Sequence, residues 1–319
     1  MTQTHKPRIG LALGSGSARG WSHIGVIRAL QEAGIEPDIV CGTSIGSLVA
    51  AAYATGELDR LEDWVKSLTW QNVVGLLDIT VNGGLIKGNK LVDFFRSHFD
   101  DIDIIKLPKP FGAVSTELAT GREVWLRDGS LIDAVRASLA VPGLFTPVEH
   151  GGMLLVDGGL VNPVPVSLCR AMGANIVIAV DLNTDMVGRT FRKPVETKER
   201  KPAKPAGQWA SMLGKLQTLG VLKSGPRSSR EMPSVLDVLA SSINIMQVRI
   251  TRSRLAGEPA DLIISPRLSQ MALMDFHRAT PAINEGSRAT NSVLPQLLQL
   301  IEVNRKRRRR KPLPFSLNA

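Results

Sequence analysis

The sequence predicts an α/β fold with a central, mostly parallel sheet flanked by helices. Over the first 183 residues, short apolar runs alternate with segments of helical periodicity, which is the pattern of strand–helix–strand units. Two of these runs end in glycine-rich turns that open directly into a helix. A chain of 319 residues, with 43% hydrophobic and 21% charged residues, has the composition of an ordinary globular protein.

The first two expected strands carry the glycine-rich turns. Residues 9–13 form an apolar run that leads into the turn 14–20, and a helix with one apolar face follows. The second run, 39–41, turns at 42–46 into an Ala-rich helix that ends near Gly56. Further strands are expected at 112–115, 124–126, 154–156 and 175–180, and helices around 57–68, 89–98, 130–139 and 165–172.

The chain divides into a core and three later segments. Residues 1–183 form the predicted catalytic core. Residues 184–232 are rich in Lys, Arg, Pro, Gly and Ser, and are interpreted as a basic insertion. Residues 233–303 complete the same domain, with a possible strand at 261–265 and a last helix at 286–303. Residues 304–319 are expected to be a basic, disordered tail.

The insertion contains one amphipathic pattern. Its apolar residues recur at i, i+3, i+4 and i+7, with lysines nearby: Trp209, Met212, Leu213 and Leu216. One interpretation is a lid or an anchor that contacts lipid. The other is a helix packed on the parent domain.

The net charge of +10 is unevenly distributed. Residues 190–230 carry ten Lys or Arg against two Glu, and the run Arg305–Lys311 adds seven basic residues, so the rest of the chain has a net charge of about −5. Basic segments on a mildly acidic body suit an anionic membrane surface better than a nucleic-acid-binding core. Peripheral contact with an anionic membrane through these two segments is therefore expected.

Cysteine usage and hydropathy indicate the compartment. The two cysteines, Cys41 and Cys169, are too few for a secreted disulfide scaffold. The polar start lacks a secretory signal, and no run reaches the ~18 apolar residues of a membrane span. The protein is expected to reside in the cytoplasm.

The strongest chemical signal is the segment Gly42-Thr-Ser44-Ile45-Gly46 between an expected strand and a helix. A serine at such a turn projects its Oγ away from the sheet, and the flanking glycines avoid collisions in the tight turn. The following helix directs N–H groups toward developing negative charge. Ser44 is therefore a candidate nucleophile; otherwise it only caps the helix.

The loop Gly14–Gly20 is a candidate oxyanion hole. Glycine and serine present little bulk, so backbone N–H groups can approach a substrate closely. The alternative is a nucleotide- or phosphate-binding loop. It is weak, because the glycine spacing is loose, no Lys-Ser or Lys-Thr follows, and Asp38 precedes the second strand rather than ending it.

Asp157 follows the apolar run 154–156 and precedes two glycines, so its carboxylate is presented in an open turn. It is the candidate general base for Ser44; otherwise it only organises that turn. A Ser-acid-His order is also possible through His277, although a packed or surface histidine is the simpler interpretation. His, Cys and acidic residues show no metal-ligand spacing, so no metal site is predicted, and no cofactor is needed.

Together these segments resemble the patatin-like phospholipase family and, within it, bacterial members of the RssA type. The resemblance rests on the following motifs: Ser15-Gly16-Ser17-Ala-Arg19-Gly20, Gly42 to Gly46, and Asp157-Gly158-Gly159. Stretches at 23–26, 116–121, 137–143 and 161–166 add to it. It is strong over residues 8–183 and weak over 233–300.

The resemblance implies a three-layer fold and a carboxylic ester hydrolase acting on lipid through a Ser44–Asp157 dyad without histidine. It places the oxyanion-hole donors at Gly16, Ser17 and Arg19, within a loop that also includes Gly14, Ser15 and Gly20, and Ile45 follows the nucleophile. One departure stands out: the family's glycine triplet is Ser15-Gly16-Ser17 here.

Two other functions remain open on the sequence. The altered triplet and the basic segments also suit a weakly active adaptor that acts through partner or membrane binding. Nucleic-acid binding through the tail ranks last, because no recognition motif accompanies the charge. The leading hypothesis is a serine acyl hydrolase of phospholipase or lysophospholipase type that forms an acyl-Ser44 intermediate.

Overall fold

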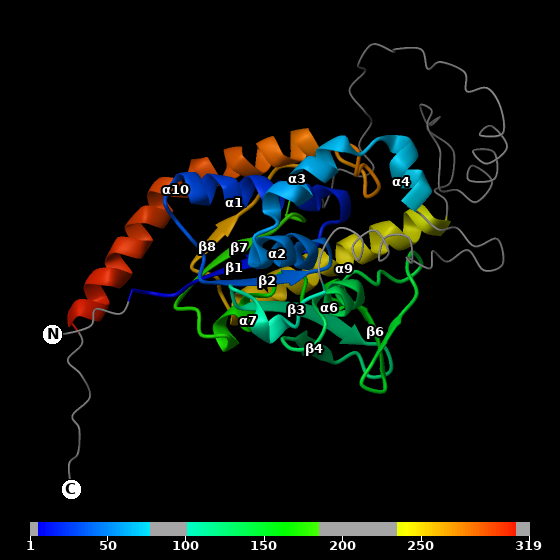
Figure 1. Cartoon of the computed structure of the whole chain (residues 1–319), viewed down its shortest axis with the longest axis horizontal. Helices are drawn as coiled ribbons and strands as arrows, with labels where there is room; N and C mark the ends of the chain where they lie inside the picture. Colours follow the sequence, from blue (N-terminus) through cyan, green and yellow to red (C-terminus); the bar gives the residue numbers. More distant parts are fainter. Residues whose placement is uncertain (1–5, 77–100, 185–234, 311–319) are drawn as a thin grey trace, which may run out of the picture.

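The computed structural model describes residues 6–76, 101–184 and 235–310 (Figure 1). In these ranges the strands form one mixed sheet in the order β5-β6-β3-β2-β1-β7-β8, with β4 paired to β3. The strands are β1 (Ile9–Leu13), β2 (Ile39–Thr43), β3 (Phe111–Glu117), β4 (Glu123–Leu126), β5 (Val148–His150), β6 (Met153–Asp157), β7 (Ile176–Val180) and β8 (Leu262–Ile264).

The centre of the sheet is parallel. β1 pairs with β2 and β7, β2 pairs with β3, and β7 pairs with β8, all in parallel. Antiparallel pairing is confined to three strands: β4 and β6 both pair with β3, and β5 pairs with β6. The predicted α/β class with a mostly parallel sheet is confirmed.

Helices cover both faces of this sheet. The α-helices are α1 (Ser22–Glu32), α2 (Ile45–Thr55), α3 (Leu58–Ser67), α4 (Trp70–Leu76), α6 (Leu131–Ser138), α7 (Val166–Ala171), α9 (Val235–Gly257) and α10 (Ala279–Arg310), and short 3-10 turns lie at Ser17–Trp21, Ile104–Lys106 and Gly158–Leu160. Figure 1 shows α1 and α10 on one side of the sheet and α7 and α9 on the other. The result is a three-layer molecule.

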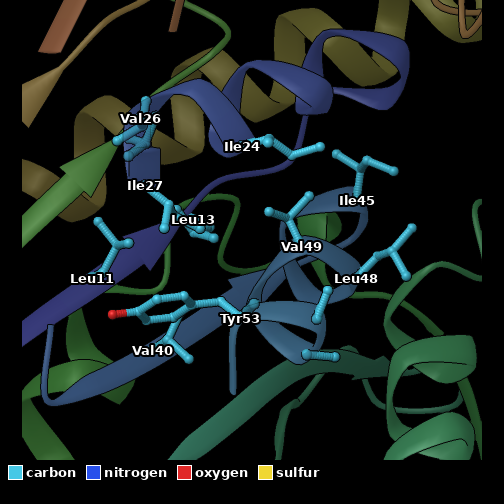
Figure 2. Close-up of a cluster of buried hydrophobic side chains, with 14 of the residues drawn as sticks. Leu11, Leu13, Ile24, Val26, Ile27, Val40, Ile45, Leu48, Val49 and Tyr53 are labelled. Carbon is cyan, nitrogen blue, oxygen red and sulfur yellow. The ribbon is translucent and has the colours of Figure 1, made fainter. Parts of the chain in front are cut away.

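Alternate residues of the central strands enter two separate cores. In β1, Leu11 and Leu13 pack with α1 and α2, whereas Ala12 packs with α7 on the opposite face. Because both faces are covered, the strands are continuously apolar rather than alternating, as buried parallel strands are. Figure 2 shows the larger core, in which side chains from β1, β2, α1 and α2 point toward one another.

Two glycines allow α1 and α10 to pack closely. A Cβ atom on Gly25 would lie 1.9 Å from the backbone oxygen of Ile283, and one on Gly286 would lie 1.9 Å from that of Ser22. The Ser287 hydroxyl also donates to the Gly25 carbonyl at 3.0 Å. The last described helix is thereby fixed against the first one.

Each expected strand is present, and β5 is an additional one. The last helix differs from the expectation, because it begins at Ala279 rather than 286 and continues to Arg310 rather than ending at 303. Arg and Lys are strong helix formers, and Lys306 pairs with Glu302 one turn earlier at 2.5 Å. The expected disorder from residue 304 is therefore wrong as far as Arg310.

The structure does not test two of the expected helices. The segment 89–98 and the amphipathic stretch of the insertion lie outside the described residues. Among the described helices, none combines the length and the apolar character that crossing a bilayer requires.

Candidate active site

Ser44 occupies the turn between β2 and α2. Its backbone has φ 56° and ψ −128°, a conformation that residues other than glycine rarely adopt. Such a residue costs on the order of 1–3 kcal/mol and is retained where the surrounding structure enforces it. The predicted sharp strand-to-helix turn is therefore present, and Ser44 is its strained residue.

The glycines on either side of Ser44 are required by close backbone contacts. A Cβ atom on Gly42 would lie 2.3 Å from the carbonyl oxygen of Gly46. One on Gly46 would lie 2.2 Å from the carbonyl oxygen of Leu13, at the end of β1. Any side chain at either position would push α2 away from the sheet.

Ser138, at the end of α6, fixes the backbone of Ser44. The Ser44 N–H donates to Ser138 Oγ at 2.9 Å, and this hydroxyl donates to the Val114 carbonyl at 2.6 Å. On the other side, the Ser47 hydroxyl donates to the Ser44 carbonyl at 2.6 Å. Both backbone groups of the strained residue are therefore hydrogen-bonded.

Asp157 ends β6 and lies opposite Ser115 of β3 in the antiparallel register. Its side chain is buried, with one oxygen occupied: Oδ1 accepts the Gly159 N–H at 2.6 Å. Oδ2 has no hydrogen-bond partner among the described residues. This carboxylate therefore keeps one oxygen available to receive a proton.

The pKa of Asp157 is raised from its ordinary value of 3.8 to about 6. Burial is the main cause, because it disfavours the charged carboxylate. The neighbouring Ser44 hydroxyl and the Gly159 N–H lower the pKa and only partly offset burial. Ser44 is thus close enough to affect the carboxylate, although the hydrogen bond from its hydroxyl to Oδ2 is not formed.

The two glycines after Asp157 also have packing reasons. A Cβ atom on Gly158 would lie 2.2 Å from the Val114 carbonyl oxygen. One on Gly159 would lie 2.4 Å from Gln247 Nε2 and 2.8 Å from Asp157 Oδ1. The Asp-Gly-Gly motif thus lets the chain turn tightly against β3 and α9.

The loop Gly14–Gly20 follows β1, next to the strand that carries Ser44. Several of its N–H groups already have backbone acceptors: Gly14 donates to Val180, Ser15 to Pro163, Ala18 to Leu273 and Arg19 to Gly16. Within the described part of the chain, the N–H groups of Gly16 and Ser17 have no acceptor. The N–H of Ile45, at the start of α2, has none there either. The candidate donors therefore narrow to Gly16, Ser17 and Ile45.

The N–H groups of Arg19 are directed toward other residues of the protein, whereas an oxyanion-hole donor would point toward a substrate. Its backbone N–H is directed to the Gly16 carbonyl at 3.3 Å, and its buried guanidinium donates to that same carbonyl from Nε at 3.1 Å. The guanidinium also reaches the Leu182 carbonyl and Asn244 Oδ1, each at 3.3 Å. Arg19 thus stabilises the loop through the Gly16 carbonyl. Gly20 leaves room for the Ile45 side chain.

The serines that replace two family glycines are both hydrogen-bonded through their side chains. Ser15 Oγ donates to Gln247 Oε1 at 3.1 Å, and Ser17 Oγ donates to the Leu273 carbonyl at 2.6 Å. Ser17 has φ 52°, so it adopts the left-handed conformation that favours glycine. Its hydroxyl bond helps to hold that conformation.

His23 contacts the first residue of the loop Gly14–Gly20. It is fully buried, and its Nε2 donates to the Gly14 carbonyl at 2.8 Å. Burial lowers the pKa of His23 to about 4, with the Gly14 contact acting weakly in the opposite direction. The ring is therefore neutral near pH 7 and can donate this hydrogen bond from Nε2.

His277 gives no support to a catalytic triad. It lies in turns before α10, and it is exposed. Its ring packs edge-on against Trp70 at 5.5 Å between centroids. The surface interpretation is the better one. The described residues also contain no group of three or more His, Cys, Asp or Glu side chains placed to hold a metal ion.

Sequence reasoning missed three residues at this site: Ser138, His23 and Gln247. The first two lie in stretches that contributed to the family resemblance, so the sequence marked these positions but assigned no role to their side chains. Gln247 lies in a helix of weak periodicity, 232 positions after its partner Ser15. No local pattern could have identified it.

Several known proteins share extended sequence similarity with this chain. The family model described as patatin-like phospholipase matches residues 11–170. An uncharacterised NTE family protein of Mycobacterium tuberculosis is 32% identical over 339 residues, covering 93% of each chain. The mouse patatin-like phospholipase domain-containing protein 6 is 39% identical over 184 residues, which is 55% of this chain and 14% of the mouse protein.

One solved structure, of VipD from Legionella pneumophila, aligns with 80% of this chain and 67% of its own at 14% identity. Its TM-score of 0.37 is too low for detailed comparison of the fold. The closer likeness to RssA-type members stays a prediction. The matched region contains Ser44, Asp157 and all of the loop, and the chain belongs to the patatin-like phospholipase family.

Proposed function

We propose that the protein is a serine acyl hydrolase that cleaves the ester bond of a phospholipid or lysophospholipid through a Ser44–Asp157 dyad. The observation that carries the proposal is the pairing of a strained serine with a buried carboxylate, one oxygen of which has no hydrogen-bond partner among the described residues. The effect of the Ser44 hydroxyl on the pKa of Asp157 supports their proximity. Membership of a lipid hydrolase family supports the class of substrate.

The first half of the reaction transfers the acyl group to the enzyme. Asp157 Oδ2 takes the proton from Ser44 Oγ as this oxygen attacks the ester carbonyl. The oxyanion is held by the N–H groups of Gly16 and Ser17, with Ile45 as a third candidate. When the tetrahedral intermediate collapses, the carbonyl–alkoxy bond breaks and the leaving alcohol takes the proton from Asp157.

The second half restores the enzyme. Asp157, again ionised, removes a proton from a water molecule as it attacks the acyl-Ser44 carbonyl. The Ser44–acyl bond then breaks, the proton returns to Ser44 Oγ, and the carboxylic acid leaves. A base with a pKa of about 6 suits both steps near pH 7, because it is ionised yet more basic than an ordinary aspartate.

The test is hydrolysis of a short p-nitrophenyl ester and of a lysophospholipid by the wild type, Ser44→Ala and Asp157→Asn. The proposal predicts turnover by the wild type and background rates for both variants. Thr251→Val serves as the matched control, since it alters a buried hydroxyl that has no partner among the described residues. An inactive wild type, or a Ser44→Ala variant that keeps its rate, would refute the hydrolase and favour an adaptor.

Peripheral contact with an anionic membrane is part of the proposal. The described residues support it through the basic end of α10, where Arg305 and Lys306 are exposed. The other basic segment, 190–230, lies outside the described residues. Residence in the cytoplasm with transient membrane contact remains our expectation.

Co-sedimentation with vesicles tests this contact. Replacing the basic residues 305–311 with Gln keeps good helix formers while removing their charge. We expect weaker binding to vesicles that contain anionic phospholipid, a reduced salt dependence because only the segment 190–230 stays basic, and unchanged hydrolysis of a soluble ester. Equal binding to anionic and purely zwitterionic vesicles would contradict an electrostatic contact.

A further inference from the structure

The oxyanion loop is held from outside the region that the family model matches. That region ends at residue 170, yet the loop contacts Asn183, Asn244, Gln247 and Leu273. Two of these residues, Asn244 and Gln247, lie three positions apart in α9 and so share one face of the helix. The same face of α9 therefore reaches the loop at two points.

These two contacts hold the loop on either side of the N–H groups that have no acceptor in the described chain. Gln247 Oε1 accepts from Ser15 Oγ at 3.1 Å, and Asn244 Oδ1 accepts from Arg19 Nη2 at 3.3 Å. Between Ser15 and Arg19 lie Gly16 and Ser17. Because those two N–H groups have no acceptor in the described chain, their direction depends on how the loop is fixed at its two ends.

Gln247 also contacts the turn that carries the proposed base. Its Nε2 lies over Gly159, where it would be 2.4 Å from an added Cβ atom. The Gly159 N–H in turn donates to Asp157 Oδ1 at 2.6 Å. A single buried side chain therefore lies between the oxyanion loop and the Asp157 turn.

A second amide completes the contact with the loop. Asn183 Nδ2 donates to the Ser15 carbonyl at 3.2 Å and lies 3.4 Å from Gln247 Oε1. The side chains of Asn183 and Gln247 are thus oriented by their mutual hydrogen bond as well as by their contacts with Ser15. A glycine at position 15, as in the family's triplet, could not make the hydroxyl contact with Gln247.

We propose that Gln247 is a positioning residue that acts through the Ser15 hydroxyl to hold the Gly16 and Ser17 N–H groups at a fixed distance from Ser44 and Asp157. In this protein the residue at position 15 is a serine rather than a more flexible glycine, and its hydroxyl is hydrogen-bonded to α9. In this proposal Gln247 acts on the loop and not on the ester. The inference rests on the proposed function, because it assigns a part in the same site.

The experiment compares Gln247→Met with Ser15→Gly. Methionine matches glutamine in length and removes the acceptor, whereas glycine at position 15 removes the donor without adding any atoms. The readouts are kcat and KM for the p-nitrophenyl ester and the rate at which a fluorophosphonate probe labels the full-length chain. In labelling, Ser44 Oγ bonds to phosphorus, fluoride leaves, and the serine proton goes to Asp157.

Each single variant is expected to lower kcat and the labelling rate about 10- to 100-fold, because small misplacements of site groups have effects of this size. KM should stay unchanged, because the donors act on the transition state rather than on substrate binding. The double variant should be no slower than the slower single variant, since both remove the same contact. Thr251→Val, one turn further along α9, should label at the wild-type rate.

The outcomes separate the two proposals. If the wild type is labelled at Ser44 but Gln247→Met labels equally fast, the positioning role is wrong and the hydrolase stands. Effects that multiply in the double variant, or that follow the loss of thermal stability, would mean that Gln247 is only structural. If Ser44 in the wild type is neither labelled nor active, both proposals fail.

Discussion

Replacing Asp157 with Asn should abolish activity and at the same time stabilise the folded protein at pH 8. The buried carboxylate has a pKa of about 6 in the folded chain against an ordinary value of 3.8. Folding therefore favours its protonated form. Well below pH 3.8 the group is neutral in both states. Between pH 3.8 and about 6 it is ionised in the unfolded state but still protonated in the folded state, so the folded state loses relative stability over this range.

The size of this effect follows from the two pKa values. The difference between 3.8 and about 6 corresponds to a cost of about 3 kcal/mol, present in full at pH 8 and largely absent at pH 4. Asn has nearly the shape of Asp, carries no charge, and can keep the contact with the Gly159 N–H. The variant should therefore unfold at higher urea concentration than the wild type at pH 8.

Urea titrations monitored by tryptophan fluorescence at pH 8 and pH 4 measure this difference. Comparing the two proteins at each pH cancels the titration of every other carboxylate. We expect the variant to be more stable by about 3 kcal/mol at pH 8 and by less than about 1 kcal/mol at pH 4. A variant that is equally or less stable than the wild type at pH 8 would refute the assignment of a buried base with a raised pKa.

Three other substitutions test the geometry of the site. Ser138→Ala removes the acceptor of the Ser44 N–H, so it should cost about 1–3 kcal/mol of stability and lower kcat, measured by urea unfolding and ester turnover. Gly46→Ala should lower the melting temperature strongly because of its backbone clash, whereas Gly257→Ala, which meets no atom within 4 Å, should not. His23→Leu should lower activity but keep the fall in activity below about pH 6 that protonation of Asp157 predicts, because burial lowers the pKa of His23 to about 4. If that fall disappeared from the pH profile of the variant, it would have to be assigned to the histidine.

The sequence predicted the sheet well because its central strands are buried on both faces. Short apolar runs such as β1 and β7 have no competing interpretation as surface helices. β5 was missed because it spans only three residues and pairs only with β6, and its two exposed residues give no apolar run. The length of α10 was underestimated because its basic residues were interpreted through their charge rather than through their helix propensity.

The site was predictable where chemistry and backbone geometry occupy the same few residues. Ser44 and Asp157 are each marked by glycines, and these glycines exist because the turns are too tight for side chains. The supports of the site carry no such mark. Ser138 lies 94 positions from Ser44, and Gln247 lies 232 positions from Ser15, so only the folded chain brings them together.

The close packing of α1 against α10 has a consequence for the order in which the protein matures. Ser44 and Asp157 are made early during translation, but the loop after β1 is fixed by Gln247 and Leu273, and α1 is fixed by the helix around Gly286. A nascent chain that has passed Asp157 thus carries both groups of the proposed dyad while the loop Gly14–Gly20 still lacks its contacts with Gln247 and Leu273. On the proposed mechanism, hydrolytic competence would arise only when the late helices dock.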